Sequence, residues 1–120
     1  MGKQSGKRSD KKEVGCPVET AIDAIGGRWK VLVIHHLLEG TQRFGQLARR
    51  LRGISARTLT KQLRELEQCG VIQRVVYQQI PPKVEYSLTD LGRALEPILL
   101  AMHDWGQRLE RRGVPIAKRR

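Results

Sequence analysis

The segment from Arg43 to Leu91 constrains the fold of this chain most, because it combines a run of basic residues with glycines and prolines that indicate turns. It reads RFGQLARRLRGISARTLTKQLRELEQCGVIQRVVYQQIPPKVEYSLTDL, a pattern of turn, short helix, tight connection, amphipathic helix and two β-type runs. Its first 22 residues contain no acidic side chain and seven basic ones: Arg43, Arg49, Arg50, Arg52, Arg57, Lys61 and Arg64. A helix pair of one charge sign followed by a hairpin with a basic tip is typical of a winged helix that meets duplex DNA.

Two helices are predicted in the first half of this segment. The first is short, and its apolar residues at helical spacing are Phe44, Leu47, Ala48 and Leu51. Gly53 allows a tight turn, and Ser55 is a favourable N-cap for a second helix that runs to Gln68. One face of this second helix is apolar, with Leu59, Leu63 and Leu66. At 100° per residue the opposite face has Arg57, Lys61, Arg64 and Gln68, flanked by Thr58 and Gln62.

Two strands are predicted in the second half, at Val71–Tyr77 and Lys83–Leu88. Both runs contain the strand-forming residues Val and Tyr, and the first also contains Ile. Ile80-Pro81-Pro82 cannot belong to a paired central strand, so it should form the tip of a hairpin. The expected fold class is therefore mainly α with a small antiparallel β-hairpin, a winged helix-turn-helix.

Two helices should precede this unit. Pro17 lies near the start of the first, whose apolar spacing (Val18, Ala21, Ile22, Ile25) ends at Gly26-Gly27. The second, Arg28–Leu38, is apolar nearly all round and is expected in the core. Its His36 is interpreted as a core histidine with its hydrogen bonds satisfied rather than a metal ligand, because the adjacent His35 points about 100° away.

A final helical region should follow Thr89, which is placed to cap it. Its apolar residues step by four and three residues, as in a coiled-coil seam: Leu91, Leu95, Ile98, Met102, Trp105 and Leu109. Pro97 interrupts the hydrogen-bond ladder, so the region is either one kinked helix or a short helix followed by a long one. A domain this small cannot cover the whole seam. We therefore expect a two-fold homodimer, completed by Val18, Ile22 and Ile25 of the first helix.

The net charge of +11 is concentrated in the two ends of the chain. Residues 1–13 are expected to form a disordered basic arm, residues 14–111 the DNA-binding and dimerisation domain, and residues 112–120 a basic tail. No apolar run is long enough to span a bilayer, and two cysteines make no disulfide framework, so a cytoplasmic protein is expected.

The exposed side chains of the second helix of the pair should read bases. Arg57 and Lys61 suit guanine, and Gln62 suits adenine. Ser55, Thr58 and Thr60 suit phosphates or base edges, and Arg49, Arg50 and Arg52 suit backbone contacts. Arg43 and Arg64 are further expected DNA contacts, and Lys83 at the wing, with Arg74, should meet the minor groove or its phosphates. No nucleophile–base pair, phosphate loop or metal-ligand spacing is visible, so neither an enzyme nor a cofactor is expected. A basic RNA- or ribosome-associated protein is the alternative, although the aromatic residues look structural rather than free to stack on bases.

The chain resembles the HxlR-type winged-helix transcriptional regulators of bacteria over about residues 15–110. The resemblance is carried by CPVETAIDAIGGRWKVLVIHHLLEG, by GIS-x-R-x-LT-x-x-LRELE and by P-x-VEYSLT-x-LG. It implies a homodimer built from the first and last helices, bound to an inverted repeat. It also implies DNA contacts by the recognition-helix residues named above (Ser55, Arg57, Thr58, Thr60, Lys61, Gln62, Arg64) and by Lys83 at the wing.

The resemblance bears on the two cysteines as well. Several such regulators sense electrophiles or oxidants through a cysteine at the place of Cys16. Here Cys16 precedes a helix N-terminus with Lys11 and Lys12 nearby, which favours a reactive thiolate. A small apolar residue packed under the first helix is the other interpretation. Cys69 stands where the family usually has a polar residue, and it is a second redox candidate.

Overall fold

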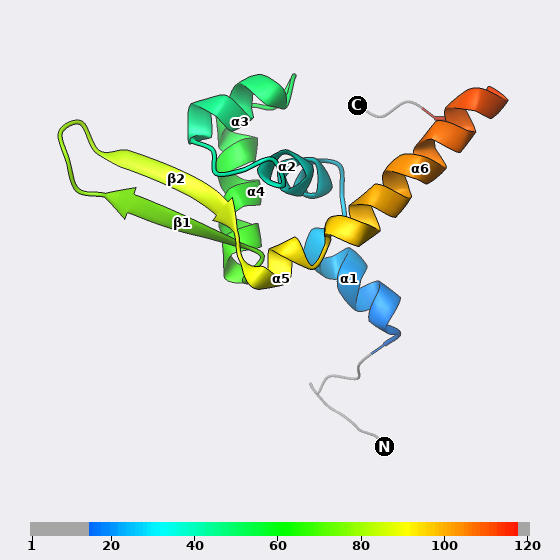
Figure 1. Ribbon diagram of the computed structural model, residues 1–120, viewed down its shortest axis with the longest axis horizontal. Coiled ribbons are helices and arrows are strands. Elements are labelled where there is room, and N and C mark those ends of the chain that lie inside the picture. Colours follow the sequence, from blue (N-terminus) through cyan, green and yellow to red (C-terminus); the bar gives the residue numbers. More distant parts are fainter. Residues whose placement is uncertain (1–14, 118–120) are drawn as a thin grey trace, which may run out of the picture.

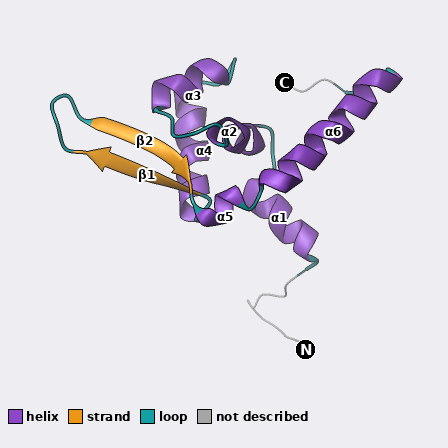
Figure 2. Ribbon diagram, viewed as in Figure 1, coloured by secondary structure: helices purple, strands orange, loops and turns teal. Residues whose placement is uncertain are grey.

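The computed structural model describes residues 15–117, which form six helices and one two-stranded sheet. Along the chain these are α1 (Pro17–Ile25), α2 (Trp29–Leu37), α3 (Phe44–Arg50), α4 (Ala56–Gln68), β1 (Ile72–Tyr77), β2 (Lys83–Leu88), α5 (Asp90–Arg93) and α6 (Glu96–Arg112). The predicted fold class, mainly helical with one antiparallel hairpin, is confirmed (Figures 1 and 2). The expected arm at residues 1–13, together with Lys11 and Lys12, lies outside the described residues, as do residues 118–120 of the expected tail.

The core lies among α2, α3, α4 and the base of the hairpin. Its fully buried side chains include Val33 and Ile34 from α2, Leu47 from α3, and Leu59, Leu63 and Leu66 from α4. These are the apolar positions that the helical spacing predicted in α3 and α4. Their removal from water supplies the main stabilisation of the domain, at about 25 cal/mol per Å² of apolar surface.

The connection between α3 and α4 is short because its residues favour a turn. Gly53 has a φ of +88°, a left-handed conformation that costs glycine little. The Ser55 hydroxyl then accepts a hydrogen bond of 3.0 Å from the Thr58 backbone N–H and caps α4. This geometry fixes α4 relative to α3 as the second helix of a helix-turn-helix.

The hairpin pairs Ile72 with Leu88 at its base and Tyr77 with Lys83 at its far end. It begins at Ile72, not at Val71 as predicted, because the Val71 N–H bonds to the Leu66 carbonyl and closes the end of α4 (3.0 Å). The face that begins with buried Ile72 and Leu88 continues through Arg74 and Tyr86.

The region after the hairpin is a short helix followed by a long one. The Thr89 hydroxyl caps α5, and the chain turns at Ala94 and Leu95 before α6 begins. Pro97 lies in the first turn of α6, where its missing N–H costs nothing. If α5 and α6 formed one continuous helix, the Pro97 ring would clash with the Arg93 carbonyl. Of the two predicted alternatives, the short helix followed by a long one is therefore confirmed. Of the predicted seam residues, Ile98, Met102, Trp105 and Leu109 share α6, while Leu91 belongs to α5 and Leu95 is the N-cap of α6.

One expectation about α2 is confirmed and another is corrected. The helix spans Trp29–Leu37 and contributes Val33, Ile34 and Leu37 to the core as expected, although Leu32 and His35 are exposed on its outer side. His36 is half-buried, and its Nδ1 has no hydrogen-bond partner among the described residues, so it is not a satisfied core histidine.

Candidate nucleic-acid interface

The outer face of α4 is an exposed polar surface. Arg57, Lys61, Arg64 and Gln68 are all exposed on it, as the helical spacing predicted. Arg57 and Arg64 form no ion pair with any residue between 15 and 117. Thr60 is also exposed, whereas Thr58 and Gln62 are half-buried at the edges of this face. The guanidinium groups therefore stand free to meet an anionic or hydrogen-bonding partner.

Lys61 is less free than its spacing suggested. Its Nζ lies 3.2 Å from one carboxylate oxygen of Glu65, and Lys30 Nζ of α2 lies 2.8 Å from the other. The hydrogen bonds from Lys30 and then Lys61 hold the pKa of Glu65 below its usual range. The Lys61–Glu65 pair follows from i,i+4 spacing, but the contact of Lys30 with α4 depends on how the helices pack.

The basic residues of α3 divide into two groups. Arg43 caps the helix, with its backbone N–H donating to the Gln46 carboxamide oxygen (2.8 Å), and Arg49 is exposed in the last turn. Arg50 instead donates to the Glu39 carboxylate after α2, and this hydrogen bond lowers the pKa of Glu39. Arg50 must therefore exchange an internal partner for any phosphate.

Lys83 opens β2, and it is held within the hairpin. Its Nζ lies 4.6 Å from the centre of the Tyr77 ring and 3.8 Å from a Glu85 carboxylate oxygen. The Glu85 carboxylate also accepts the Tyr77 hydroxyl hydrogen bond, which raises the pKa of Tyr77. Lys83 is thus positioned at the far end of the paired strands, with part of its charge offset.

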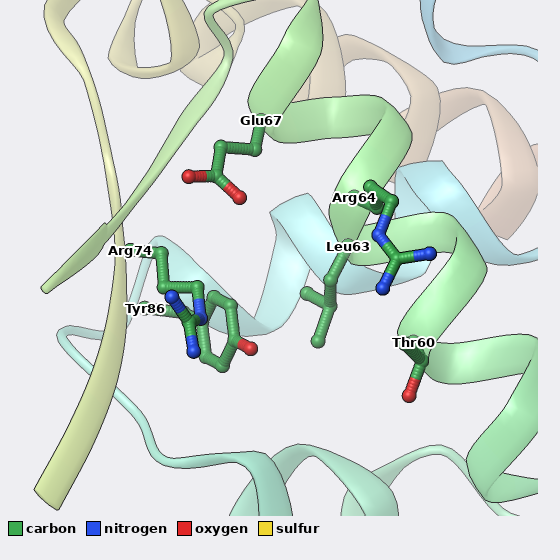
Figure 3. Close-up of a pocket in the computed structure, with 6 residues that line it drawn as sticks. All are labelled: Thr60, Leu63, Arg64, Glu67, Arg74 and Tyr86. Carbon is green, nitrogen blue, oxygen red and sulfur yellow. The ribbon is translucent and has the colours of Figure 1, made fainter. Parts of the chain in front are cut away.

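A polar groove of about 340 Å³ separates α4 from the hairpin. Figure 3 shows Thr60, Arg64 and Glu67 reaching it from α4, and Arg74 and Tyr86 from the two strands. The structure thus brings Arg64 and Arg74 to one groove although they belong to different elements. The sequence analysis did not predict that Glu67 and Tyr86 line this groove. Glu67 lies outside the basic face of α4, and Tyr86 belongs to β2.

The two cysteines are both exposed and free. Cys16 is the N-cap of α1, where its sulfur accepts a hydrogen bond of 3.3 Å from the Val18 N–H. The Cys16 N–H in turn donates to the Glu19 carboxylate at 3.3 Å. Cys69 is the C-cap residue of α4. The interpretation of Cys16 as a buried packing residue is therefore wrong for the isolated protomer.

Most of the predicted dimer-interface residues expose apolar side chains to solvent. Val18 and Ile22 of α1 and Ile98, Met102 and Trp105 of α6 are all at least half exposed, Trp105 by 62%. Ile25, Leu95 and Leu109 are half-buried, and Ile25 and Leu95 pack against the core. Figure 1 shows α6 extending away from the three-helix core, and within residues 15–117 these apolar side chains remain exposed.

The exposed basic face of α4, its fixed angle to α3 and the adjoining hairpin define a winged helix-turn-helix protein. Residues 24–113 match the sequence profile described as HxlR-like helix-turn-helix, and the chain belongs to that family. It is accordingly a helix-turn-helix transcriptional regulator. No helix in residues 15–117 combines the length and hydropathy needed to cross a bilayer.

Similar proteins support this assignment. The HTH-type transcriptional regulator YdeP of Bacillus subtilis is 55% identical over 98 residues, which cover 82% of this chain and 77% of YdeP. The redox regulator HypR in its oxidised form is 53% identical with a TM-score of 0.74, covering 78% of this chain and 96% of HypR. The diamide-treated form of the regulator YodB from B. subtilis is 36% identical with a TM-score of 0.67, covering 80% of this chain and 96% of YodB.

Proposed function

We propose that this regulator binds a palindromic duplex DNA operator as a homodimer, with one α4 helix in each of two successive major grooves. The observation that carries the proposal is the exposed polar face of α4, whose other face is buried in the core. Base readout is assigned to Arg57, Lys61 and Gln62. Backbone contacts are assigned to Arg43, Arg49, Arg50, Ser55, Thr58, Thr60 and Arg64, with Arg74 and Lys83 from the hairpin.

The proposed role is regulation in the cytoplasm, where the DNA lies, and not catalysis. The names of the relatives support it, since those reported above are regulators. In the proposed domain plan, residues 14–111 bind DNA and dimerise, while the ends of the chain add non-specific attraction to phosphates.

The operator can be found by selecting duplexes from a random pool with the whole protein. We expect half-sites about 10 bp apart, centre to centre. Arg57→Ala should weaken operator binding by about 1–3 kcal/mol and relax base preference at one position. Lys83→Ala is the matched control: it should weaken all sequences alike, and it should lower the salt dependence by about one unit.

Two results would contradict the proposal. Equal operator binding by Arg57→Ala and wild type would remove α4 as the reading helix. In a gel-shift competition, preference for structured RNA over duplex DNA would favour the alternative of an RNA-associated protein.

We further propose that oxidants or electrophiles control DNA binding through Cys16. The thiol is exposed at the N-terminus of α1, where a reagent in solution can reach it, and α1 belongs to the proposed dimer interface. The likeness to the redox regulator HypR and to the diamide-treated form of YodB supports a redox role for this chain. Cys69 is a candidate partner, either through a bridge between subunits or as an independent site.

Operator binding by wild type, Cys16→Ser and Cys69→Ser before and after diamide tests this mechanism. Diamide should change binding by wild type and leave Cys16→Ser unchanged, and Cys69→Ser reports whether a second thiol is needed. If wild type does not respond, or if Cys16→Ser responds equally, Cys16 has no switching role.

A further inference from the structure

The tip of the hairpin, residues 78–82, presents an apolar side chain that no residue between 15 and 117 covers. Ile80 is 100% exposed, more than any other large apolar residue among residues 15–117. Together with Val76, Tyr77 and Pro82 it lines a shallow hollow of about 630 Å³. Because burial of an isoleucine is worth about 1.5–3 kcal/mol, this tip gains nothing in the isolated chain and favours an apolar contact elsewhere.

The length of the hairpin prevents Ile80 from reaching the core. Six residues of β1 pair with six of β2, so the tip lies about 20 Å from the hairpin base. Only Ile72 of β1 is buried, and the rest of the strand is exposed out to Tyr77. Figure 1 shows the paired strands projecting beyond the three helices of the core.

The apolar surface near the tip shares its face with the groove beside α4. Val76 and Val84 follow Arg74 and Tyr86 on the same side of the sheet, because side chains alternate along each strand. Arg74 and Tyr86 line that groove together with Arg64 of α4. A duplex seated on α4 would therefore pass the face of the hairpin that leads to Ile80.

The chemistry of the tip suits a minor groove. Its sequence Gln78-Gln79-Ile80-Pro81-Pro82 contains no acidic side chain, and the basic Lys83 follows it at the start of β2. Carboxamide N–H groups can donate to the adenine N3 and thymine O2 acceptors of the groove floor. Proteins that enter the minor groove often insert isoleucine or proline between base steps and kink the duplex.

We propose that Ile80 is a minor-groove wedge that bends the operator, with Gln78 and Gln79 donating to A·T edges beside it. The proposal rests on the proposed function, since it requires duplex DNA on α4. It predicts a base preference at operator positions that α4 does not contact. The step under Ile80 should be a pyrimidine–purine step such as TA, which kinks most easily.

The test uses the whole protein and duplexes that it selects from a random pool. Bending is measured by gel mobility of equal-length duplexes in which the selected site is moved from end to centre. Wild type should bend the site by at least about 20°. Ile80→Ala should lose most of this bend and bind about tenfold more weakly, with the same salt dependence because no charge changes.

Val75→Ala is the matched control, because Val75 is an exposed apolar residue on the opposite face of the hairpin. It should keep the wild-type bend and affinity. Replacing the TA step with AA should weaken wild type several-fold and leave Ile80→Ala nearly unaffected.

The outcomes separate the two proposals. If wild type binds and bends DNA and Ile80→Ala does the same, the wedge is overturned and operator binding stands. If Ile80→Ala changes only the sedimentation coefficient, the tip is a protein contact and the wedge is again overturned. If wild type binds no duplex, the proposed function fails, and the wedge fails with it.

Discussion

Gln42 joins three segments of the fold although it belongs to none of its helices or strands. Its backbone exchanges hydrogen bonds with Tyr86 of β2, at 3.0 and 2.8 Å, and its side-chain Nε2 donates to the His36 carbonyl at 2.6 Å. It is only 6% exposed. A buried amide in this position connects the end of α2 to the hairpin just before α3 begins.

Gln42→Leu should destabilise the protein by about 1–3 kcal/mol, because the part-buried His36 carbonyl loses its side-chain donor. Urea unfolding followed by circular dichroism measures the change. The control is Gln68→Leu on the exposed face of α4, which should stay within about 0.5 kcal/mol. Equal effects of the two variants would mean that the Gln42 side chain contributes nothing.

His36 should make stability depend on pH. Burial, and then the positive charges of His35 and Arg50, lower the pKa of His36, while Glu39 partly offsets them. Below the ordinary histidine value of about 6.5 the unfolded chain therefore binds more protons than the folded one, so stability falls as the solution is acidified through this range.

The melting temperature at pH 7.5 and pH 5.5 (about one unit either side of the ordinary value) tests this. His36→Gln should lose less stability on acidification than wild type, whereas exposed His103→Gln should behave as wild type does. If His36→Gln loses as much stability on acidification as wild type does, the pH dependence comes from other groups.

At the scale of elements, the junction between the hairpin and α5 depends on a close approach. The Thr89 N–H and hydroxyl both lie 3.1 Å from the Val71 carbonyl oxygen, and the Gly92 N–H donates to the Thr89 hydroxyl at 3.2 Å. A Cβ atom on Gly92 would lie 2.2 Å from the same Val71 oxygen. Only glycine lets α5 pack this closely on the start of β1.

Gly92→Ala should therefore cost about 1–3 kcal/mol of stability, since backbone must move to admit the methyl group. Gly45→Ala, at an exposed position of α3, is the matched control. Its Cβ would meet nothing closer than 3.6 Å, so it should stabilise the helix by about 0.5–1 kcal/mol. Thermal unfolding of both variants gives the comparison, and a neutral Gly92→Ala would show that α5 can shift freely.

At the scale of the whole molecule, the uncovered faces of α1 and α6 predict assembly. Ile98, Ala101, Met102 and Trp105 line one continuous apolar surface with Pro97, and monomers seldom leave such a surface in water. Wild type should sediment as a dimer at micromolar concentration.

Trp105→Glu should give monomers or insoluble protein and abolish operator binding, because a charge would be buried in the interface. Gln107→Glu, two residues along α6 and exposed, should remain dimeric. A stable wild-type monomer, or a dimeric Trp105→Glu, would move the interface elsewhere.

The amino-acid sequence alone determined the order and type of the elements, since these depend on interactions between near neighbours. Leucine spacing in α4, the Ser55 cap, the Gly53 turn and the prolines after Ile80 act within a few residues. The opposed basic face followed from the same spacing, because one face of an amphipathic helix implies the other.

Tertiary structure decided what depends on distant partners. Packing of α2 on α4 brings Lys30 to Glu65, and the turn after α2 brings Glu39 to Arg50, so two basic residues are less free than spacing suggested. Burial of Gln42, exposure of Ile80 and the uncovered face of α6 likewise follow from where the core ends. Spacing along a chain records which residues share a face, whereas the assembled core determines whether that face meets protein or solvent.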